Sequence, residues 1–449
     1  MTLFGTDGIR GEAGVAPLDS ETVARIGGAL ARATGRAGLR AIVGRDTRES
    51  GQWIEDALAR GLASEGATLV SAGVVPTPAI AYLTKADGFD LGLVISASHN
   101  PFQDNGIKVF SGAGEKFSAT MEREVERIVA DQSWQVPAAP HAATPGGDLA
   151  EHYMAHLRQI FAVAGPLAGT RIVVDCANGA TSTLAPGLFR SLGLAVEVIG
   201  ATPDGRNINL GCGSTAMAAL QAQVVASGAA LGVAFDGDGD RALFVDHCGR
   251  RVDGDAVMLI CADLLRAESS LTGAAIVATV MSNIGLELAL KARGVALVRC
   301  PVGDKYVMEE MLARGLALGG EQSGHVIFAR HLYTGDGMAT ALHVLRAMAA
   351  TGHDLATLAA GLTAYPQVLV NVRVKARIDI SAVPAVAEVM RDVEARLDGQ
   401  GRLLVRYSGT EPLLRIMIEG RDQDEIRAWA DEIAVAVRTH LAPDPWSLL

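Results

Sequence analysis

Short apolar runs rich in β-branched residues alternate with longer segments of helical periodicity along most of the chain. Such alternation predicts strands that are linked by crossover helices in parallel sheets. The pattern occurs three times, which indicates an internal structural repeat of roughly 100 residues per unit. The predicted strands are residues 39–44, 68–73 and 91–96, then 171–175, 195–200 and 230–235, then 275–280, 296–300 and 316–318. The clearest predicted helices are residues 52–64, 77–85, 284–293 and 304–314.

The last part of the chain follows a different pattern. Residues 368–374 alternate between apolar and polar positions, and a long helical segment covers 383–397. Two further strand-like runs, 403–408 and 413–419, precede an amphipathic segment at 423–441. This order indicates a small α+β domain with a mostly antiparallel sheet.

The segment 135–147 contains three prolines and two glycines and is the clearest candidate linker. The sequence therefore predicts an α/β protein with three similar mixed- or parallel-sheet domains plus a smaller C-terminal α+β domain. The predicted domain boundaries are 1–147, 148–250, 251–365 and 366–449.

Composition narrows the class of protein. The chain has 449 residues, too many for one ordinary core, and its net charge of −11 argues against a nucleic-acid or anionic membrane partner. The five cysteines form no Cys-x-x-Cys pair, and the first residues carry charges where a signal peptide needs an apolar run. The uncharged stretch 207–235 contains Asn, Gln and Gly, which excludes a membrane span. We expect a cytoplasmic globular protein.

Three aspartates follow this uncharged stretch within five positions. Asp236, Asp238 and Asp240 are separated by Gly237 and Gly239, and an apolar run that reads as a buried strand precedes them. We expect both glycines to adopt positive φ angles, so that the three carboxylates turn toward one point. Two carboxylates about 4 Å apart repel by roughly 4 kcal/mol at an effective dielectric constant near 20. A hard cation such as Mg²⁺ or Ca²⁺ would offset that repulsion.

Two other interpretations of this loop are weaker. An acidic, glycine-rich turn is often only a solvated hairpin. An EF-hand loop fits poorly because its sixth position, normally Gly, is Arg241, and its twelfth, normally Glu, is His247. A divalent-metal site at the end of a strand is the favoured interpretation, with Mg²⁺ preferred if the site handles phosphate.

A second loop follows the predicted strand 91–96. Pro101 ends regular structure in Ile95-Ser-Ala-Ser-His-Asn-Pro101, so we expect Ser98 to be exposed at the carboxyl end of a strand, where open α/β sheets bind ligands. A Ser-His-Asp hydrolase is disfavoured because no Gly-x-Ser-x-Gly elbow surrounds Ser98. Lys108 is either a surface lysine or a general acid or base.

A third loop, Gly319-Gly-Glu-Gln-Ser-Gly-His325, follows a short apolar run. Glu321 and Ser323 have the acceptors and donors that bind sugar hydroxyls. His325 is either a proton carrier or a structural histidine that satisfies local hydrogen bonds.

The fourth loop, Arg406-Tyr-Ser-Gly-Thr-Glu-Pro412, is a cationic candidate site in an acidic chain. Ser408, Gly409 and Thr410 offer hydroxyl and backbone N–H donors, and Arg406 offers a bidentate fork for phosphate. Arg415 adds a second guanidinium. Neither a dinucleotide-binding Gly-x-Gly-x-x-Gly nor a P-loop is present.

Taken together, the four loops resemble the α-D-phosphohexomutase superfamily, in which each of four domains contributes one such loop. The resemblance covers the whole chain, with the loops in the family's order and spacing. The segments Phe4-Gly-Thr-Asp-Gly-Ile-Arg-Gly11 and Asn207-Ile-Asn-Leu-Gly-Cys-Gly-Ser-Thr215, together with Gln322, are similar to the bacterial phosphoglucosamine mutase family. Tyr407 departs from the small or basic residue that the resemblance implies beside the phosphate turn.

The resemblance implies a role for each matched residue. Ser98 would be the residue that carries the phosphoryl group, and an oxygen of that phosphate would bind Mg²⁺ together with Asp236, Asp238 and Asp240. Acid–base catalysis would fall to Lys108 and His325, and electrostatic support to Arg10 and Arg241. Sugar hydroxyls would bind Glu321 and Ser323. The phosphate that is not reacting would bind Arg406, Ser408, Gly409, Thr410 and Arg415.

The resemblance also implies an arrangement and a reaction. The four domains would surround a central cleft and supply, in chain order, the phosphoserine, the metal site, the sugar site and the phosphate site. The enzyme, a monomer or homodimer with one Mg²⁺ per subunit, would act on a small phosphosugar and supply amino-sugar nucleotide and cell-wall precursor synthesis. It would interconvert glucosamine 6-phosphate and glucosamine 1-phosphate through glucosamine 1,6-bisphosphate, with that compound or glucose 1,6-bisphosphate as activator. The near alternative is phosphomannomutase/phosphoglucomutase activity, and the distant one is a non-catalytic sugar-phosphate binder.

Overall fold

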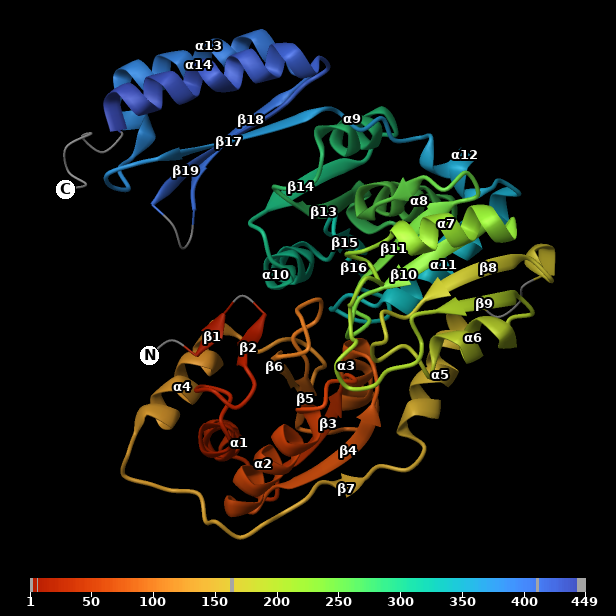
Figure 1. Cartoon of the computed structure of the whole chain (residues 1–449), viewed down its shortest axis with the longest axis vertical. Helices are drawn as coiled ribbons and strands as arrows, with labels where there is room; N and C mark the ends of the chain where they lie inside the picture. Colours follow the sequence, from red (N-terminus) through yellow and green to blue (C-terminus); the bar gives the residue numbers. More distant parts are fainter. Residues whose placement is uncertain (1–2, 6, 162–164, 409–411, 442–449) are drawn as a thin grey trace. The chain divides into compact units, whose positions relative to one another are not determined.

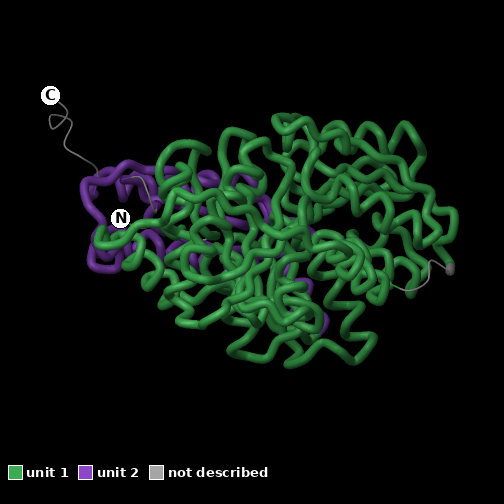
Figure 2. Tube along the Cα trace, turned by 90° about the horizontal axis from the view of Figure 1, so that it is seen from below, with its two compact units in different colours: residues 1–282, 294–361 green, residues 283–293, 362–449 purple. Residues whose placement is uncertain are grey.

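The computed structural model describes residues 3–5, 7–161, 165–408 and 412–441. The chain forms two compact units (Figure 2). Unit 1 comprises residues 1–282 and 294–361, and unit 2 comprises residues 283–293 and 362–449. Among the described residues, no helix is both long and apolar enough to cross a lipid bilayer.

The first sheet of unit 1 has helices on both faces. On one face, α1, α2 and α4 share an apolar core with the strands, and on the other face α3 packs against the sheet. Gly44 and Gly92 allow this close approach, because a Cβ atom at either would collide with Ile80 or Thr84 of α3. The strands, in sheet order, are β1 Phe4–Gly5, β2 Gly8–Glu12, β6 Asp104–Ser111, β5 Leu91–Ile95, β3 Arg40–Arg45, β4 Thr68–Val74 and β7 Thr144–Pro145. The helices are α1 Ser20–Thr34, α2 Gly51–Ser64, α3 Thr77–Ala86 and α4 Ala119–Ala130.

The predicted linker 135–147 has no regular structure apart from β7, which pairs with β4 at the edge of this sheet. It leads into α5 (Leu149–Ile160).

Two further sheets complete unit 1. The second consists of β12 Arg251–Val252, β11 Ala242–Asp246, β10 Leu231–Phe235, β8 Arg171–Asp175 and β9 Ala195–Ile199, with helices α6 Ala185–Ser191 and α7 Ala218–Ser227. The third consists of β14 Ala296–Cys300, β13 Ala275–Thr279, β15 Leu318–Gly320 and β16 Val326–Phe328, with helices α8 Gly254–Ala267, α10 Asp304–Arg314, α11 Gly337–Thr351 and α12 Leu355–Ala359. The strand predicted at 316–318 lies two residues later, because its two glycines belong to the strand. A Cβ at Gly319 would collide with Met311 of α10.

All three sheets contain the same four-strand arrangement (Figure 1). In chain order, the second strand lies at one side, followed by the first, the third and the fourth: β4-β3-β5-β6, β9-β8-β10-β11 and β14-β13-β15-β16. The first three strands run parallel, as predicted, but the fourth returns antiparallel to the third. The three α/β units of the predicted fold class are therefore confirmed, with mixed rather than purely parallel sheets.

Unit 2 is a smaller α+β domain, as predicted. Its antiparallel sheet has the order β17 Gln367–Arg373, β19 Leu413–Glu419 and β18 Arg402–Tyr407. Helices α13 Pro384–Leu397 and α14 Gln423–Leu441 lie on one face of this sheet (Figure 1) and share an apolar core with it. The segment 283–293, which contains α9 Ile284–Ala292, also belongs to this unit.

Candidate active site

Ser98 lies in the loop that joins β5 to its antiparallel neighbour β6. It adopts a left-handed backbone conformation, with φ of 53°, and its Oγ donates a hydrogen bond of 2.6 Å to Asp236 Oδ2. The prediction that Ser98 is exposed is wrong, since only 1% of the residue is accessible. The acidic loop of the second sheet covers it, and no local pattern in the sequence reports that contact.

The three aspartates occupy the equivalent loop of the second sheet, between β10 and β11. Asp236, Asp238 and Asp240 are all buried, and one carboxylate oxygen of each lies within 4.8 Å of the others. The carboxylates therefore converge as predicted. The prediction that both glycines have a positive φ is wrong for Gly237, because only Gly239 has one, 70°. Gly237 is required by space, since a Cβ there would collide with the carbonyl oxygen of Ser98.

Lys108 lies on β6 with its ammonium group among carboxylates. Its Nζ is 2.8 Å from Asp238 Oδ2 and 3.0 Å from both Asp240 Oδ2 and Asp7 Oδ2. It is only 2% accessible, which excludes the interpretation as a surface lysine. Burial acts to lower the pKa of Lys108, but the three carboxylates outweigh burial and hold that pKa well above its ordinary value.

The acidic cluster has capacity for a further cation. Asp238 Oδ1 and Asp240 Oδ1 are buried and accept no hydrogen bond from the described part of the chain. Burial, together with Asp240 and Asp238, raises the pKa of Asp236 well above its ordinary value, so Lys108 alone does not offset the charge of the cluster. An all-carboxylate donor set suits a hard ion such as Mg²⁺. A second grouping of potential ligand atoms, from Asp240, Asp304 and His325, shares one aspartate with the first.

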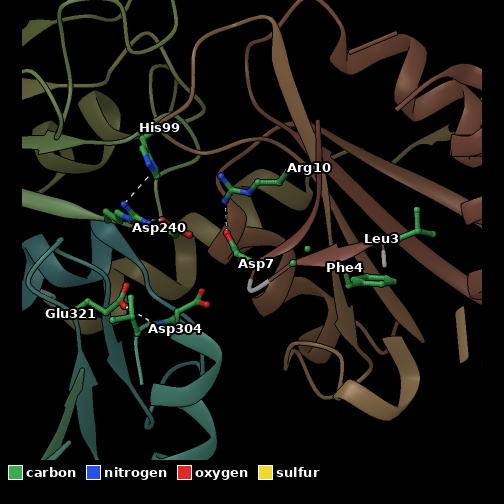
Figure 3. Close-up of a pocket in the computed structure, with 13 residues that line it drawn as sticks. Leu3, Phe4, Asp7, Arg10, His99, Asp240, Asp304 and Glu321 are labelled. Carbon is green, nitrogen blue, oxygen red and sulfur yellow. Dashed lines mark hydrogen bonds and ion pairs between the residues drawn. The ribbon is translucent and has the colours of Figure 1, made fainter. Parts of the chain in front are cut away.

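A cavity of about 540 Å³ opens next to this cluster (Figure 3). Four of its lining residues were predicted as site residues: Arg10, Asp240, Arg241 and Glu321. Three other titratable lining residues were not: Asp7, His99 and Asp304. Ser98, Lys108 and His325 are buried, each no more than 2% accessible. The cavity has the volume of a small-ligand site and a strongly charged wall.

Two arginines line the cavity close to the Ser98 loop. Arg10, on β2, donates from one terminal nitrogen to the carbonyl of Ala97 at 3.1 Å and from the other to Asp7 Oδ2 at 2.6 Å (Figure 3). The Nε atom of Arg241 lies 3.8 Å from Asp240 Oδ1 and 3.9 Å from Asp236 Oδ2. Both guanidinium groups therefore lie where they stabilise added negative charge near Ser98.

His325 is held by its neighbours. The backbone N–H of Gly335 donates to its Nε2 at 2.9 Å, and its Nδ1 lies 3.6 Å from Asp240 Oδ2. Burial acts to lower the pKa of His325, but Asp240 and Asp304 raise it above its ordinary value.

The sugar-binding candidates lie in the loop between β15 and β16. Glu321 accepts a hydrogen bond from the backbone N–H of Gly303 at 3.3 Å and lies beside Ser323, whose Oγ donates to it at 3.4 Å. Glu321 and Asp304 lie side by side at the cavity (Figure 3).

The candidate phosphate residues belong to unit 2. Arg406 on β18 and Arg415 on β19 are directly opposite each other in the sheet register, so their side chains share one face. Their neighbours Tyr407 and Ile416 pack in the core under α13 and α14, which places both arginines on the face without helices. Arg415 donates to Ser408 Oγ at 3.3 Å. The predicted residues Gly409 and Thr410 lie outside the described residues.

The sequence did not predict a further group of charged residues beside the acidic cluster. Lys116 contacts both Asp7 and Asp304, and it links the first and third sheets through these ion pairs. Asp7 lies inside the motif of residues 4–11, so the sequence contained a signal for this residue that the prediction did not use. Asp304 and Lys116 stand in no recognised motif, and only the tertiary fold brings them together.

The chain is similar to known proteins over nearly its whole length. Profiles of phosphoglucomutase/phosphomannomutase alpha/beta/alpha domains I, II and III match residues 1–136, 151–249 and 253–365, and the C-terminal domain profile matches residues 369–436. The chain is 49% identical to a phosphoglucosamine mutase of Solibacter usitatus, over 98% of this chain and 99% of that protein. It is 47% identical to a phosphoglucosamine mutase of Geotalea daltonii, over 98% of each.

Solved structures share the fold. A phosphoglucomutase/phosphomannomutase family protein of Burkholderia thailandensis matches with a TM-score of 0.80 at 25% identity, over 97% of both chains. An N-acetylphosphoglucosamine mutase of Aspergillus fumigatus, solved with GlcNAc-6P and magnesium, matches with a TM-score of 0.65 at 19% identity, over 97% of this chain and 95% of that one. The family resemblance seen in the sequence is confirmed: the chain belongs to the phosphoglucosamine mutase family of phosphohexomutases, which are isomerases.

Proposed function

We propose that this chain interconverts glucosamine 6-phosphate and glucosamine 1-phosphate through glucosamine 1,6-bisphosphate, with Ser98 as the phosphoryl carrier. The observation that carries the proposal is the 2.6 Å hydrogen bond from Ser98 Oγ to Asp236, inside a converging aspartate cluster beside a charged cavity. A hydroxyl group in that position is held where a transferred phosphoryl group meets cationic side chains on several sides.

In each half-reaction one P–O bond breaks and another forms. A hydroxyl oxygen of the bound monophosphate attacks the phosphorus of phospho-Ser98, the bond from phosphorus to Oγ breaks, and the sugar becomes the bisphosphate. The hydroxyl loses its proton to a base, and Ser98 Oγ regains one. After the bisphosphate turns around, the reverse transfer from its other phosphate restores phospho-Ser98 and releases the isomer.

Each candidate residue has a proposed role. Asp236, Asp238, Asp240 and a phosphate oxygen on Ser98 would hold one Mg²⁺ per subunit, whose charge stabilises the transferring phosphoryl group. Arg10 and Arg241 add positive charge at the same place. Lys108 and His325 are the proposed acid–base pair, since both lie among the carboxylates of the cluster. Glu321 and Ser323 would bind sugar hydroxyls. The non-reacting phosphate would bind Arg406, Ser408, Gly409, Thr410 and Arg415.

Substrate preference tests the specific form of the proposal. We expect kcat/KM for glucosamine 1-phosphate to exceed that for glucose 1-phosphate and mannose 1-phosphate by at least about tenfold, since an ammonium group in an acidic cavity gains charge-assisted hydrogen bonds. The measurement compares the three sugar 1-phosphates under one set of conditions. A strong preference for mannose 1-phosphate would refute the glucosamine assignment in favour of phosphomannomutase/phosphoglucomutase activity, while leaving the mutase mechanism in place.

A second prediction concerns the phosphate site of unit 2. We expect Arg406→Ala to raise KM for both isomers by about 10-fold to 100-fold, because a bidentate charge-assisted contact to phosphate is lost. Release of the bisphosphate intermediate during turnover should also increase, while phosphorylation of Ser98 is largely retained. Arg438→Ala is the matched control, since Arg438 lies on α14, on the opposite side of this sheet. Unchanged KM and unchanged intermediate release in Arg406→Ala would move phosphate binding to Arg415.

A further inference from the structure

We propose that Arg48 and Asn209 are positioning residues that hold the backbone of Ser98 in the conformation needed for phosphoryl transfer. This inference rests on the proposed function. Neither residue lines the 540 Å³ cavity, so neither is placed to touch the sugar phosphate. Both donate hydrogen bonds to the backbone carbonyl of Ser98.

Arg48 lies in the loop after β3 and is buried, with 2% of its surface accessible. A guanidinium group has five N–H donors, and here they have five acceptors, four of which are backbone carbonyls of residues 98–104. The acceptors are Asp46 Oδ2 at 2.9 Å, Ser98 O at 3.1 Å, Asn100 O at 2.8 Å, Asp104 O at 2.9 Å and Pro101 O. One side chain therefore organises the whole loop that carries Ser98.

These contacts close into a ring around the Ser98 residue. The backbone N–H of Ser98 donates to Ser96 Oγ at 2.9 Å, and that hydroxyl donates to Asp46 Oδ2 at 2.6 Å. Asp46 in turn accepts from Arg48, which donates to the carbonyl of Ser98. Both backbone polar groups of Ser98 are thus fixed through Arg48.

Asn209 holds the same carbonyl from the second sheet. Its Nδ2 donates to Ser98 O at 2.9 Å and to Asn100 O at 3.2 Å. Asn209 itself has a positive φ of 60°, and its backbone N–H donates to the carbonyl of Ala177 at 2.8 Å. This contact gives a structural role to the segment 207–215. The segment resembles a family motif, but the proposed reaction assigns it no role.

The need for such support follows from the backbone of Ser98. A left-handed conformation is unfavourable for a residue with a Cβ and persists only where its surroundings enforce it. Because this conformation aims Oγ at Asp236, a relaxed loop would displace the phosphate from the acidic cluster. Displacement of a reacting group by about 1 Å slows a reaction on the order of 100-fold without a corresponding loss of substrate binding.

The test uses two variants of the full chain. Asn209→Gly removes the amide and keeps a residue that tolerates positive φ, and Arg48→Lys keeps the charge but cannot supply the same set of donors. Each protein is labelled with radioactive phosphate on Ser98 and mixed with glucosamine 6-phosphate, and the rate constant of transfer is measured per phosphorylated site. Asn207→Ala is the control, because the Asn207 side chain lies in the same segment and contacts Asp204 and Thr202 instead.

We expect the per-site rate constant to fall at least about tenfold in Asn209→Gly and further in Arg48→Lys, with KM within about twofold of wild type. Asn207→Ala should match wild type. Since the rate is counted per phosphorylated site, a loss of folded protein alone would not lower it. An unchanged rate constant in Asn209→Gly would overturn the inference, whether or not Arg48→Lys folds. Absence of phosphate on Ser98 in the wild-type enzyme would instead overturn the proposed function itself.

Discussion

Replacing Ser98 by alanine is expected to abolish mutase turnover, with kcat lowered on the order of 10⁴-fold or more, because the covalent carrier of the phosphoryl group is lost. The fold should survive. The substitution removes one hydroxyl whose hydrogen bond to Asp236 contributes about 1 kcal/mol, and added Mg²⁺ would compensate the buried carboxylate that loses this bond. The measurements are kcat in a coupled assay and the thermal unfolding midpoint of the same preparation.

Mass spectrometry of peptides gives the complementary observation. Phosphate should be found on Ser98 in at least part of the purified wild-type enzyme. Ser96 is the natural comparison, since its hydroxyl lies two residues away and is committed to Asp46. Phosphate found reproducibly on Ser96, together with full activity of Ser98→Ala, would contradict the assignment.

Removal of the metal is expected to have the second largest effect. After exhaustive chelation, activity should fall at least about 100-fold and return on addition of Mg²⁺, because the cation offsets both the aspartate cluster and the transferring charge. Asp238→Asn should raise the Mg²⁺ concentration for half-maximal activity by at least about tenfold. It removes one negative ligand while leaving an oxygen that accepts from Thr77 and Lys108.

Asp246→Asn is the matched control for that variant. Asp246 is also a buried aspartate of the second sheet, at the end of β11, but its carboxylate binds the turn at Cys248–Arg250. Its substitution should lower stability without shifting the Mg²⁺ requirement. Full activity of the chelated wild-type enzyme would show that Lys108 alone is a sufficient counter-ion.

The sequence predicted those parts of the fold that local patterns determine. Apolar runs identified the parallel strands within one or two residues, and β-branched alternation identified the antiparallel sheet of unit 2. The return strands β6, β11 and β16 were missed. The first of these contains Asp104, Asn105 and Lys108, polar residues that disguise a buried strand. The burial of Lys108 depends on carboxylates of the second sheet, which a local pattern does not contain.

The same limit applies to the site. Each loop was recognisable by its residue types, yet its environment was not. Lys108 looked like a possible surface residue because two of the three carboxylates that neutralise it lie 130 and 132 positions away in the chain. Ser98 looked exposed because Asp236 covers it from 138 positions away. Residue type therefore predicted the chemistry, whereas burial and pairing needed the tertiary structure.

The position of the site loops between adjacent strands has a consequence for how these sites can change. Each of the four loops joins two neighbouring antiparallel strands, so its two ends are pinned roughly 5 Å apart by the sheet itself. A loop with fixed ends can be lengthened, shortened or rewritten without moving the strands that carry it. Each site loop can therefore change independently of the others. New substrate contacts arise by replacement of residues within one loop, while the sheets and their cores stay as they are.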